Sequence, residues 1–270
     1  MKLATIRTID GARAVRIDED AAVEIGPGDV GELLSSGAWR DRAHTADGRR
    51  HRIDTLDYAP LVLRPEKIIC VGLNYRSHIQ EMGRDIPKYP TLFAKYYRCL
   101  IGARDEIVLP AASVAIDWEA ELGVVIGTEV RHASIDQAHH AIAGYTVIND
   151  ITARDWQYRT PQWLQGKTFE ATTPIGPWLV TDIEAGPRKV SCTVDGVTVQ
   201  LSNTSDLVFP PADLVAYVST MITLVPGDII ATGTPGGVGH ARTPPEYLTG
   251  GQRVVTSIEG VGECDNQTRA

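Results

Sequence analysis

Cysteine is scarce in this chain of 270 residues, and its four thiols are spread along the sequence. They are Cys70, Cys99, Cys192 and Cys264. No two of them form the closely spaced pair of a cysteine zinc site or a redox motif, and their wide separation does not indicate a disulfide framework. We therefore expect each cysteine to be a buried, reduced thiol that packs as a small hydrophobic side chain.

Long hydrophobic runs are also missing. No window approaches the roughly 18 to 20 apolar residues that a membrane-spanning helix needs. The first twenty residues alternate apolar and polar side chains instead of forming the apolar stretch of a signal peptide. We expect no membrane partner and a cytoplasmic location.

The chain has no excess of basic residues. Lysine and arginine total 26 against 34 acidic residues, which gives a formal net charge of −8 and argues against a nucleic-acid partner. The densest group of arginines lies at positions 40–52, where aspartates are interleaved with them. This stretch has no clear period, so we expect a solvated loop.

The first 60 or so residues indicate a small β-rich domain. Residues 2–7 and 13–17 alternate with period two around Asp10-Gly11, which predicts a hairpin, and a short helix is expected at residues 30–34. Pro60 and Pro65 bracket an apolar run that suits a boundary. We predict one domain at residues 1–62 and a larger one at residues 63–270.

The larger part reads as many strands with few helices. Expected strands cover residues 67–71, 91–94, 116–126, 144–148, 190–194, 197–201, 228–231 and 253–258; expected helices cover 77–82, 135–142 and 210–221. Asp195-Gly196 is the strongest hairpin signal. Because strands and helices do not alternate regularly, we expect a mainly β or α+β fold.

Acidic residues with a spacing of two form the densest chemical signal. Asp117, Glu119 and Glu121 precede an apolar run, and on a strand all three would point to one face. Neighbouring carboxylates repel one another unless a cation or protons intervene, and a hard cation such as Mg²⁺ prefers oxygen ligands. Asp150, at the end of another apolar strand, could be a third ligand. A solvent-facing acidic strand is the alternative.

Two further groups could take part in catalysis or substrate binding. His78 and Glu81 are neighbours on a helix at i and i+3, so the carboxylate can orient the imidazole as a base. A plain surface contact is the alternative. Lys167, among glycine and apolar residues, could pair with a substrate carboxylate or simply be exposed. The glycine-rich residues 232–239 lack the ending of a P-loop, and they could bind an anion or form a tight loop.

Taken together, these segments resemble the fumarylacetoacetate hydrolase family. The resemblance runs from about Lys67 to the C-terminus. It is carried by GLNYRSHIQEM, LFAK, DWEAELGVVIG, NDITARDWQ, GKTFEATTPIGPW and PGDIIATGTPGGVG, in that order. It implies a mixed β-roll or β-sandwich, usually a homodimer, with one Mg²⁺ or Mn²⁺ per subunit.

The resemblance also implies roles for individual residues. The matching positions are Glu119, Glu121 and Asp150 for the metal, His78, Glu81 and Lys167 for catalysis, and Arg154, Gln157 and Thr234 near the substrate. Arg98 stands where many members have a small hydroxyl residue. It could favour a second carboxylate on the substrate or face solvent.

The expected substrate is a small 2-oxo acid that chelates the cation. In the first hypothesis, His78 removes a proton from water, and the hydroxide cleaves a carbon–carbon bond of an acylpyruvate or fumarylpyruvate. The same enolate chemistry would serve an isomerase or decarboxylase acting on a 2-oxo dicarboxylate, such as 2-hydroxyhepta-2,4-diene-1,7-dioate or oxaloacetate. A fold does not select between these reactions. A catalytically idle metal-binding protein is a further alternative.

Overall fold

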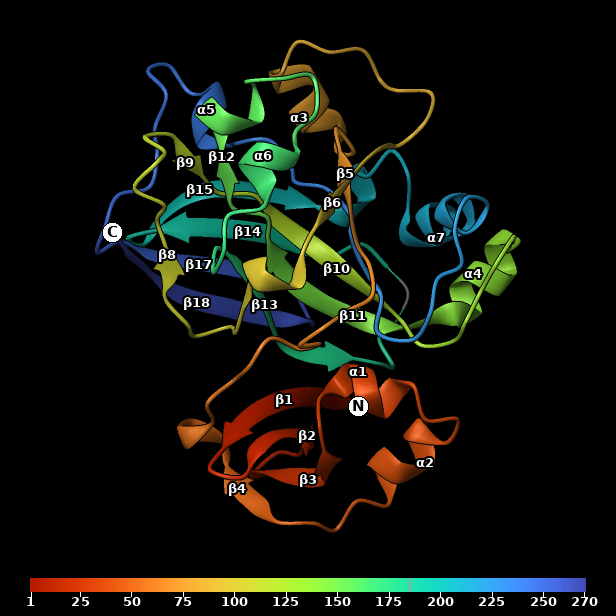
Figure 1. Cartoon of the computed structure of the whole chain (residues 1–270). Coiled ribbons are helices and arrows are strands. Elements are labelled where there is room, and N and C mark those ends of the chain that lie inside the picture. The colour runs from red at the N-terminus through yellow and green to blue at the C-terminus, as the bar shows by residue number, and fades with distance from the viewer. Residues whose placement is uncertain (185) are drawn as a thin grey trace.

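The computed structural model describes residues 1–184 and 186–270, and sheets dominate it. Figure 1 shows the first four strands gathered with α1 and α2 at one end of the molecule, away from α3, α5 and α6. These N-terminal elements are β1 (Lys2–Thr8), β2 (Gly11–Ile17), β3 (Ala21–Pro27), α1 (Val30–Leu34), α2 (Trp39–His44) and β4 (Arg50–Arg52). Among the described residues, no helix is long and apolar enough to cross a membrane.

The remaining elements contribute to two larger sheets and one small one. The strands are β5 (Ile68–Gly72), β6 (Thr91–Lys95), β7 (Leu100–Ile101), β8 (Ile107–Val108), β9 (Ile116–Asp117), β10 (Ala120–Ile126), β11 (Ile142–Asn149), β12 (Thr152–Ala153), β13 (Thr173–Val180), β14 (Lys189–Val194), β15 (Val197–Asn203), β16 (Ile229–Ala231), β17 (Arg253–Ile258) and β18 (Gly262–Arg269). The helices are α3 (Arg76–Glu81), α4 (Ile135–Ala141), α5 (Arg154–Gln157), α6 (Leu164–Lys167) and α7 (Pro211–Ser219).

One long mixed sheet runs through the molecule in the order β4-β3-β2-β1-β13-β11-β10-β16-β5-β6. A second sheet, β15-β14-β17-β18-β8, packs against it. Their shared core contains Leu122 and Val147 from the long sheet and Val190, Ile258 and Cys264 from the second. Burying apolar faces between two sheets supplies the main stabilisation of such an arrangement. The expected sheet-dominated fold is confirmed.

Helices α4 and α7 cover another part of the long sheet. Leu214 and Val218 of α7 share a buried cluster with Ala138 of α4 and with Val124 and Ile230 of the sheet. The predicted start of α4 is confirmed, because Ser134 accepts the amide N–H of Gln137 in a capping box. Figure 1 shows α3, α5 and α6 grouped together, apart from α4 and α7.

The N-terminal strands join the long sheet through β1, which pairs antiparallel with β13. They also have a small core of their own, which includes Ile6, Val15 and Tyr58. The boundary between residues 62 and 63 stays a prediction.

The predicted loop at residues 40–52 is wrong, because the structure has α2 and β4 there. Trp39 and Ala43 are buried on one side of α2. They are four residues apart, as on one face of a helix, but the arginines between and around them hid this spacing in the sequence. Arg16 Nη1 donates to the carbonyl oxygens of Ala43 and His44 at 2.6 and 2.9 Å, which satisfies the end of the helix. Arg16 comes from β2, which is distant in the sequence, so no local pattern around residues 39–44 could have predicted this contact.

Ser77, expected at the start of the helix at residues 77–82, lies inside α3 and does not cap it. The helix begins at Arg76, and the Ser77 amide donates instead to Oδ2 of Asp206 at 2.9 Å. The carboxylate that satisfies the first turn therefore comes from a segment 129 residues away. By contrast, the hairpin at Asp195 and Gly196 is confirmed, with positive φ at both residues.

Candidate active site

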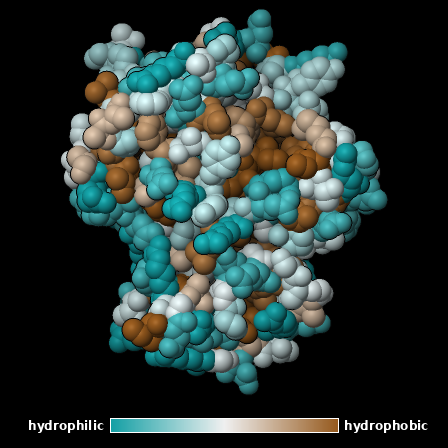
Figure 2. Space-filling model, viewed as in Figure 1, coloured by the Kyte–Doolittle hydropathy of each residue, from teal (hydrophilic) through white to brown (hydrophobic). Residues whose placement is uncertain are grey.

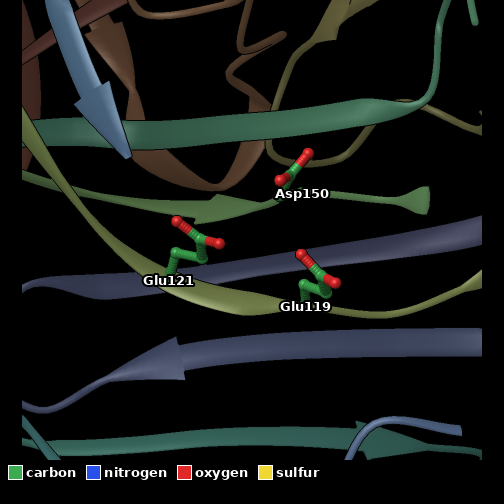
Figure 3. A group of neighbouring side chains, drawn as sticks. All are labelled: Glu119, Glu121 and Asp150. Carbon is green, nitrogen blue, oxygen red and sulfur yellow. The ribbon is translucent and has the colours of Figure 1, made fainter. Parts of the chain in front are cut away.

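Three carboxylates meet where β10 and β11 run side by side. Glu121 lies in β10, Glu119 immediately precedes that strand, and Asp150 follows β11. The antiparallel ladder pairs Glu121 with Ile148, and the Asp150 amide donates to the Glu119 carbonyl at 2.9 Å. Figure 3 shows the three carboxyl groups pointing toward one another. One ligand oxygen from each lies within 4.8 Å of the others, and all three residues are buried.

Asp117 does not join this group, although strand periodicity predicted a shared face. The strand breaks between β9 and β10, so the alternation is not continuous from Asp117 to Glu119. Its carboxylate accepts the amide N–H groups of Gly239 and His240 at 2.7 and 2.9 Å. It also accepts a 2.8 Å bond from Nε of Arg154. Asp117 therefore positions that arginine.

Buried cations neutralise most of the negative charge. Lys167 Nζ donates to Oε2 of Glu119 at 2.6 Å and to Oδ2 of Asp150 at 2.8 Å. Lys95 Nζ donates to the other Asp150 oxygen at 2.6 Å. Arg154 Nη2 lies 2.7 Å from Oε1 of Glu119 as an ion pair, without the alignment of a hydrogen bond. Of the four acids Asp117, Glu119, Glu121 and Asp150, only Glu121 has no cation within ion-pair distance among the described residues.

Glu121 is held by a backbone amide instead of a cation. Gly233 N donates to its Oε2 at 2.7 Å. Gly233 has a φ of +100°, and a Cβ there would lie 2.8 Å from the Val71 carbonyl oxygen, so only glycine fits this approach. The glycine-rich segment after β16 therefore holds a metal-ligand candidate in place.

The pKa values of the buried side chains differ because Asp150 has lysine partners and Glu121 has none. Burial, with the charges of Asp150 and Glu119 added, raises the pKa of Glu121 well above its usual value. Burial also acts to raise the pKa of Asp150, but Lys167 and Lys95 outweigh it and lower that pKa to about 2. Burial acts to lower the pKa of Lys167, yet Asp150 and Glu119 raise it above its usual value, so this lysine stays a cation. An ionised Glu121 is the group that most needs a further positive charge.

The donor set fits a divalent metal ion. Carboxylate oxygens are the preferred ligands of hard cations, and Glu119, Glu121 and Asp150 offer one each within a short distance. Four carboxylates, counting Asp117, face three cations, so one negative charge is left for the ion to neutralise. Glu119, Glu121 and Asp150 would hold it.

A cavity of about 370 Å³ opens beside the carboxylates. Most of the predicted site residues line it: His78, Glu119, Glu121, Arg154, Gln157, Lys167 and Thr234. Phe93 and Trp163 form an apolar wall with ring centroids 5.6 Å apart, and Lys167 Nζ lies 4.8 Å from the Phe93 ring centroid. A wall of this kind strengthens electrostatic contacts inside the cavity, because it excludes water.

His78 reaches the cavity from α3, and its Nδ1 lies 3.1 Å from Oε2 of Glu81. The other Glu81 oxygen accepts the Gly237 amide at 2.8 Å, which anchors the pair to the glycine-rich segment. An Nδ1–H that donates to Glu81 leaves Nε2 free as the basic nitrogen. His78, held by Glu81, therefore lines the same cavity as Glu119 and Glu121.

The predicted substrate-binding residues separate into two groups. Arg154 Nη1 donates to Oε1 of Gln157 at 2.9 Å, and Thr234 accepts from Gln200 at 2.8 Å, all beside the cavity. Arg98 is not among the lining residues. Its side chain is 66% exposed, and its nearest acidic neighbour is Glu170 at 3.9 Å.

Sequence reasoning missed several residues that complete the site. Lys95 is the last residue of β6, one beyond the expected strand at residues 91–94, and its partnership with Asp150 spans 55 residues, beyond any local pattern. Tyr158 lines the cavity directly after α5, and Arg84 lines it from the segment after α3.

Figure 2 shows hydrophobic residues gathered on the larger upper part of the molecule, bordered by hydrophilic ones. The four cysteines take no part in this surface or in the carboxylate group, because all four are buried, as expected. Burial raises the pKa of Cys70 well above its usual value, so its thiol is not an activated nucleophile.

Comparison with known proteins extends these observations. The chain is 48% identical to the mitochondrial oxaloacetate tautomerase Fahd2a of Rattus norvegicus over 210 residues, which cover 76% of this chain and 67% of that protein. It is 43% identical to the mitochondrial oxaloacetate tautomerase fahd2 of Xenopus laevis over 244 residues, covering 87% and 76%.

Solved structures match over the whole chain. The fumarylacetoacetate hydrolase of psychrophilic Exiguobacterium antarcticum has a TM-score of 0.89 at 32% identity, and the 5-carboxymethyl-2-hydroxymuconate delta-isomerase of Mycobacterium smegmatis has 0.85 at 31%. Each comparison covers 100% of this chain and 99% of the other. The family described as fumarylacetoacetate (FAA) hydrolase C-terminal matches residues 67–269. With its carboxylate group and its sheet-dominated fold, this chain belongs to the fumarylacetoacetate hydrolase family.

Proposed function

We propose that this protein is a metal-dependent isomerase that interconverts the keto and enol forms of a 2-oxo dicarboxylate of the oxaloacetate class. The observation that carries the proposal is that the His78 imidazole lines the same cavity as Glu119 and Glu121, two members of the three-carboxylate group. The relatives named as oxaloacetate tautomerases and the isomerase among the solved structures support it. We therefore propose isomerisation in place of carbon–carbon hydrolysis, the first hypothesis from the sequence.

Mg²⁺ or Mn²⁺, one per subunit, is the cofactor we propose for Glu119, Glu121 and Asp150. Such a cation would act as a Lewis acid that polarises the 2-oxo group and makes the neighbouring carbon more acidic. The chain itself supplies the proton transfer. Enolisation moves one proton from carbon 3 to the 2-oxygen and changes no carbon–carbon bond.

His78 is the proposed base. Its Nδ1 faces Glu81 at 3.1 Å, so Nε2 takes the proton from carbon 3 and the carboxylate stabilises the imidazolium that results. The imidazolium then gives this proton to the 2-oxygen, which completes the enol and returns His78 to its neutral form; the reverse direction uses the same two transfers. The segments that hold Glu81 in place, through Gly237, keep the ring oriented.

Lys167 is proposed as a fixed cation. Its pKa is raised, so it remains protonated and stabilises negative charge that develops on the substrate oxygen. Arg154, fixed between Asp117 and Gln157, supplies a second positive group on the cavity wall. Gln157 and Thr234 offer polar contacts for the substrate carboxylate.

The direct test follows the ultraviolet absorbance of the enol after ketonised oxaloacetate is mixed with the protein. We expect equilibration to be faster than in buffer with Mg²⁺ or Mn²⁺, and to fall to the buffer rate with a chelator. A rate equal to buffer under all conditions would overturn the proposal. The chelator-treated protein, reloaded with cation, controls for damage.

Hydrolysis of an acylpyruvate is the second candidate. The same Nε2 of His78 could take a proton from water, and one similar solved structure is named a fumarylacetoacetate hydrolase. Pyruvate release from acetylpyruvate or fumarylpyruvate, without enol equilibration of oxaloacetate, would favour hydrolysis. Loss of carbon dioxide from oxaloacetate would favour a decarboxylase.

A homodimer is proposed as the assembly, and light scattering of the purified chain measures it. A cytoplasmic location stays a prediction, and the names of the two tautomerases place those proteins in mitochondria. Fractionation of the native cell tests it.

A further inference from the structure

The cavity has one cationic lining residue without an acidic partner. Four basic side chains line it: His78, Arg84, Arg154 and Lys167. His78 faces Glu81, and the two buried cations are paired with Asp117, Glu119 and Asp150. Across residues 1–184 and 186–270, no carboxylate lies within ion-pair distance of Arg84, which is exposed. Its guanidinium is therefore available to a ligand.

The backbone of Arg84 is fixed to the helix that carries His78. Gly83 follows Met82, the C-cap of α3; it has a φ of +63°, and its amide donates to the Gln80 carbonyl at 3.0 Å. The Arg84 amide donates to the Ile79 carbonyl at 3.0 Å. These two bonds form the motif that commonly closes a helix at a left-handed glycine. Arg84 and the proposed base are thus held in one local unit.

The charge of the buried group explains why a further cation matters. Its four carboxylates and three cations leave one negative charge, which a bound divalent ion would convert to one positive charge. One positive charge balances the single carboxylate of a 2-oxo monoacid. A second carboxylate needs a positive group outside the buried set, and a guanidinium suits a carboxylate because it can donate two parallel hydrogen bonds.

We propose that Arg84 is a specificity-determining residue that selects 2-oxo acids carrying a second, distal carboxylate. The inference rests on the proposed function for the orientation of the substrate, with its 2-oxo acid end at Glu119, Glu121 and Asp150. It assigns to Arg84 the role that the sequence suggested for Arg98, which lies outside the cavity.

The test measures binding and does not need turnover. Calorimetry on the Mg²⁺-loaded protein compares 2-oxoglutarate and 2-oxoadipate with the distal monomethyl ester of each. We expect the diacids to bind the unaltered protein more tightly than their esters. In Arg84→Gln, diacid binding should weaken about 10-fold, the size of one charge-assisted hydrogen bond, while ester binding stays unchanged. Arg84→Lys should recover part of the loss.

Lys88→Gln is the matched control, because Lys88 is a cation of the same segment that does not line the cavity and lies against the Tyr89 ring. It should leave both affinities unchanged. Equal diacid binding by Arg84→Gln and the unaltered protein would overturn the inference, as would equal weakening of diacid and ester. So would a protein that does not distinguish diacids from esters at all.

The outcome is separable from that of the proposed function. Enol equilibration of oxaloacetate is measured on the same preparation. Selective diacid binding that depends on Arg84, without equilibration, would reject the isomerase and keep the inference. Enol equilibration without a preference for diacids would keep the isomerase and reject the role of Arg84.

Discussion

Nζ of Lys167 lies 2.6 Å from Oε2 of Glu119, and the same ammonium also reaches Asp150 at 2.8 Å. The lysine arrives from α6, whose Gly166 packs so closely that a Cβ would lie 2.5 Å from the Ala153 carbonyl oxygen. One side chain therefore ties two metal-ligand candidates to a third element. The arrangement of the carboxylates depends on this link.

Replacing Lys167 by methionine should destabilise the protein without added metal. The change removes two charge-assisted hydrogen bonds in a buried site, so we expect the free energy of unfolding to fall by about 2 to 4 kcal/mol in urea denaturation. Lys189→Met, at an exposed position of β14, is the control and should change it by less than about 0.5 kcal/mol. Equal stabilities of the two variants would contradict the buried pairing.

Glu121→Gln should separate metal binding from folding. Because the pKa of Glu121 is raised, its ionised form costs folding free energy at neutral pH, and this cost disappears below the ordinary pKa of a glutamate. The metal-free variant should therefore be at least as stable as the unaltered protein near pH 7. Mg²⁺ at 100 times its dissociation constant should add about 2.7 kcal/mol to the unaltered protein, and the variant should lose most of this gain. An undiminished gain in the variant would remove Glu121 from the metal site.

His78→Ala should lower kcat for enol equilibration about 100- to 10,000-fold, the usual contribution of a general base. The stabilisation by Mg²⁺ should remain, because His78 is not in the carboxylate group. Glu81→Gln should lose less activity, since an amide oxygen can still accept the Gly237 N–H. Unchanged activity in His78→Ala would exclude the imidazole as the base.

Arg98→Ala tests whether Arg98 binds a substrate carboxylate, as the sequence suggested, or takes no part in binding, as its position outside the cavity indicates. The side chain is 66% exposed, and the ion pair to Glu170 at 3.9 Å should contribute no more than about 1 kcal/mol to folding. We expect KM for oxaloacetate to change less than about 2-fold, since Arg98 lies outside the cavity. A large rise in KM in steady-state assays would return Arg98 to substrate binding.

Local periodicity made part of the site predictable. Glu119 and Glu121 share a direction because side chains two apart on an extended chain do so. His78 and Glu81 meet because positions i and i+3 are adjacent on a helix. The residues alone suggested Asp150 and Lys167 only as separate candidates. The resemblance joined them to the glutamate pair and added Arg154, which no spacing within one element could have done.

The sequence by itself determined the sheet-dominated fold, the order of most strands along the chain and the pairs of residues that share one element. Tertiary structure alone decided which elements meet: the ladder of β10 and β11 brought Asp150 to Glu119, while a break before β10 took Asp117 to Arg154. It likewise placed Arg84 on the cavity and Arg98 outside it. Backbone geometry fixes side-chain direction within an element, whereas distances between elements depend on strand register and packing that no short pattern encodes.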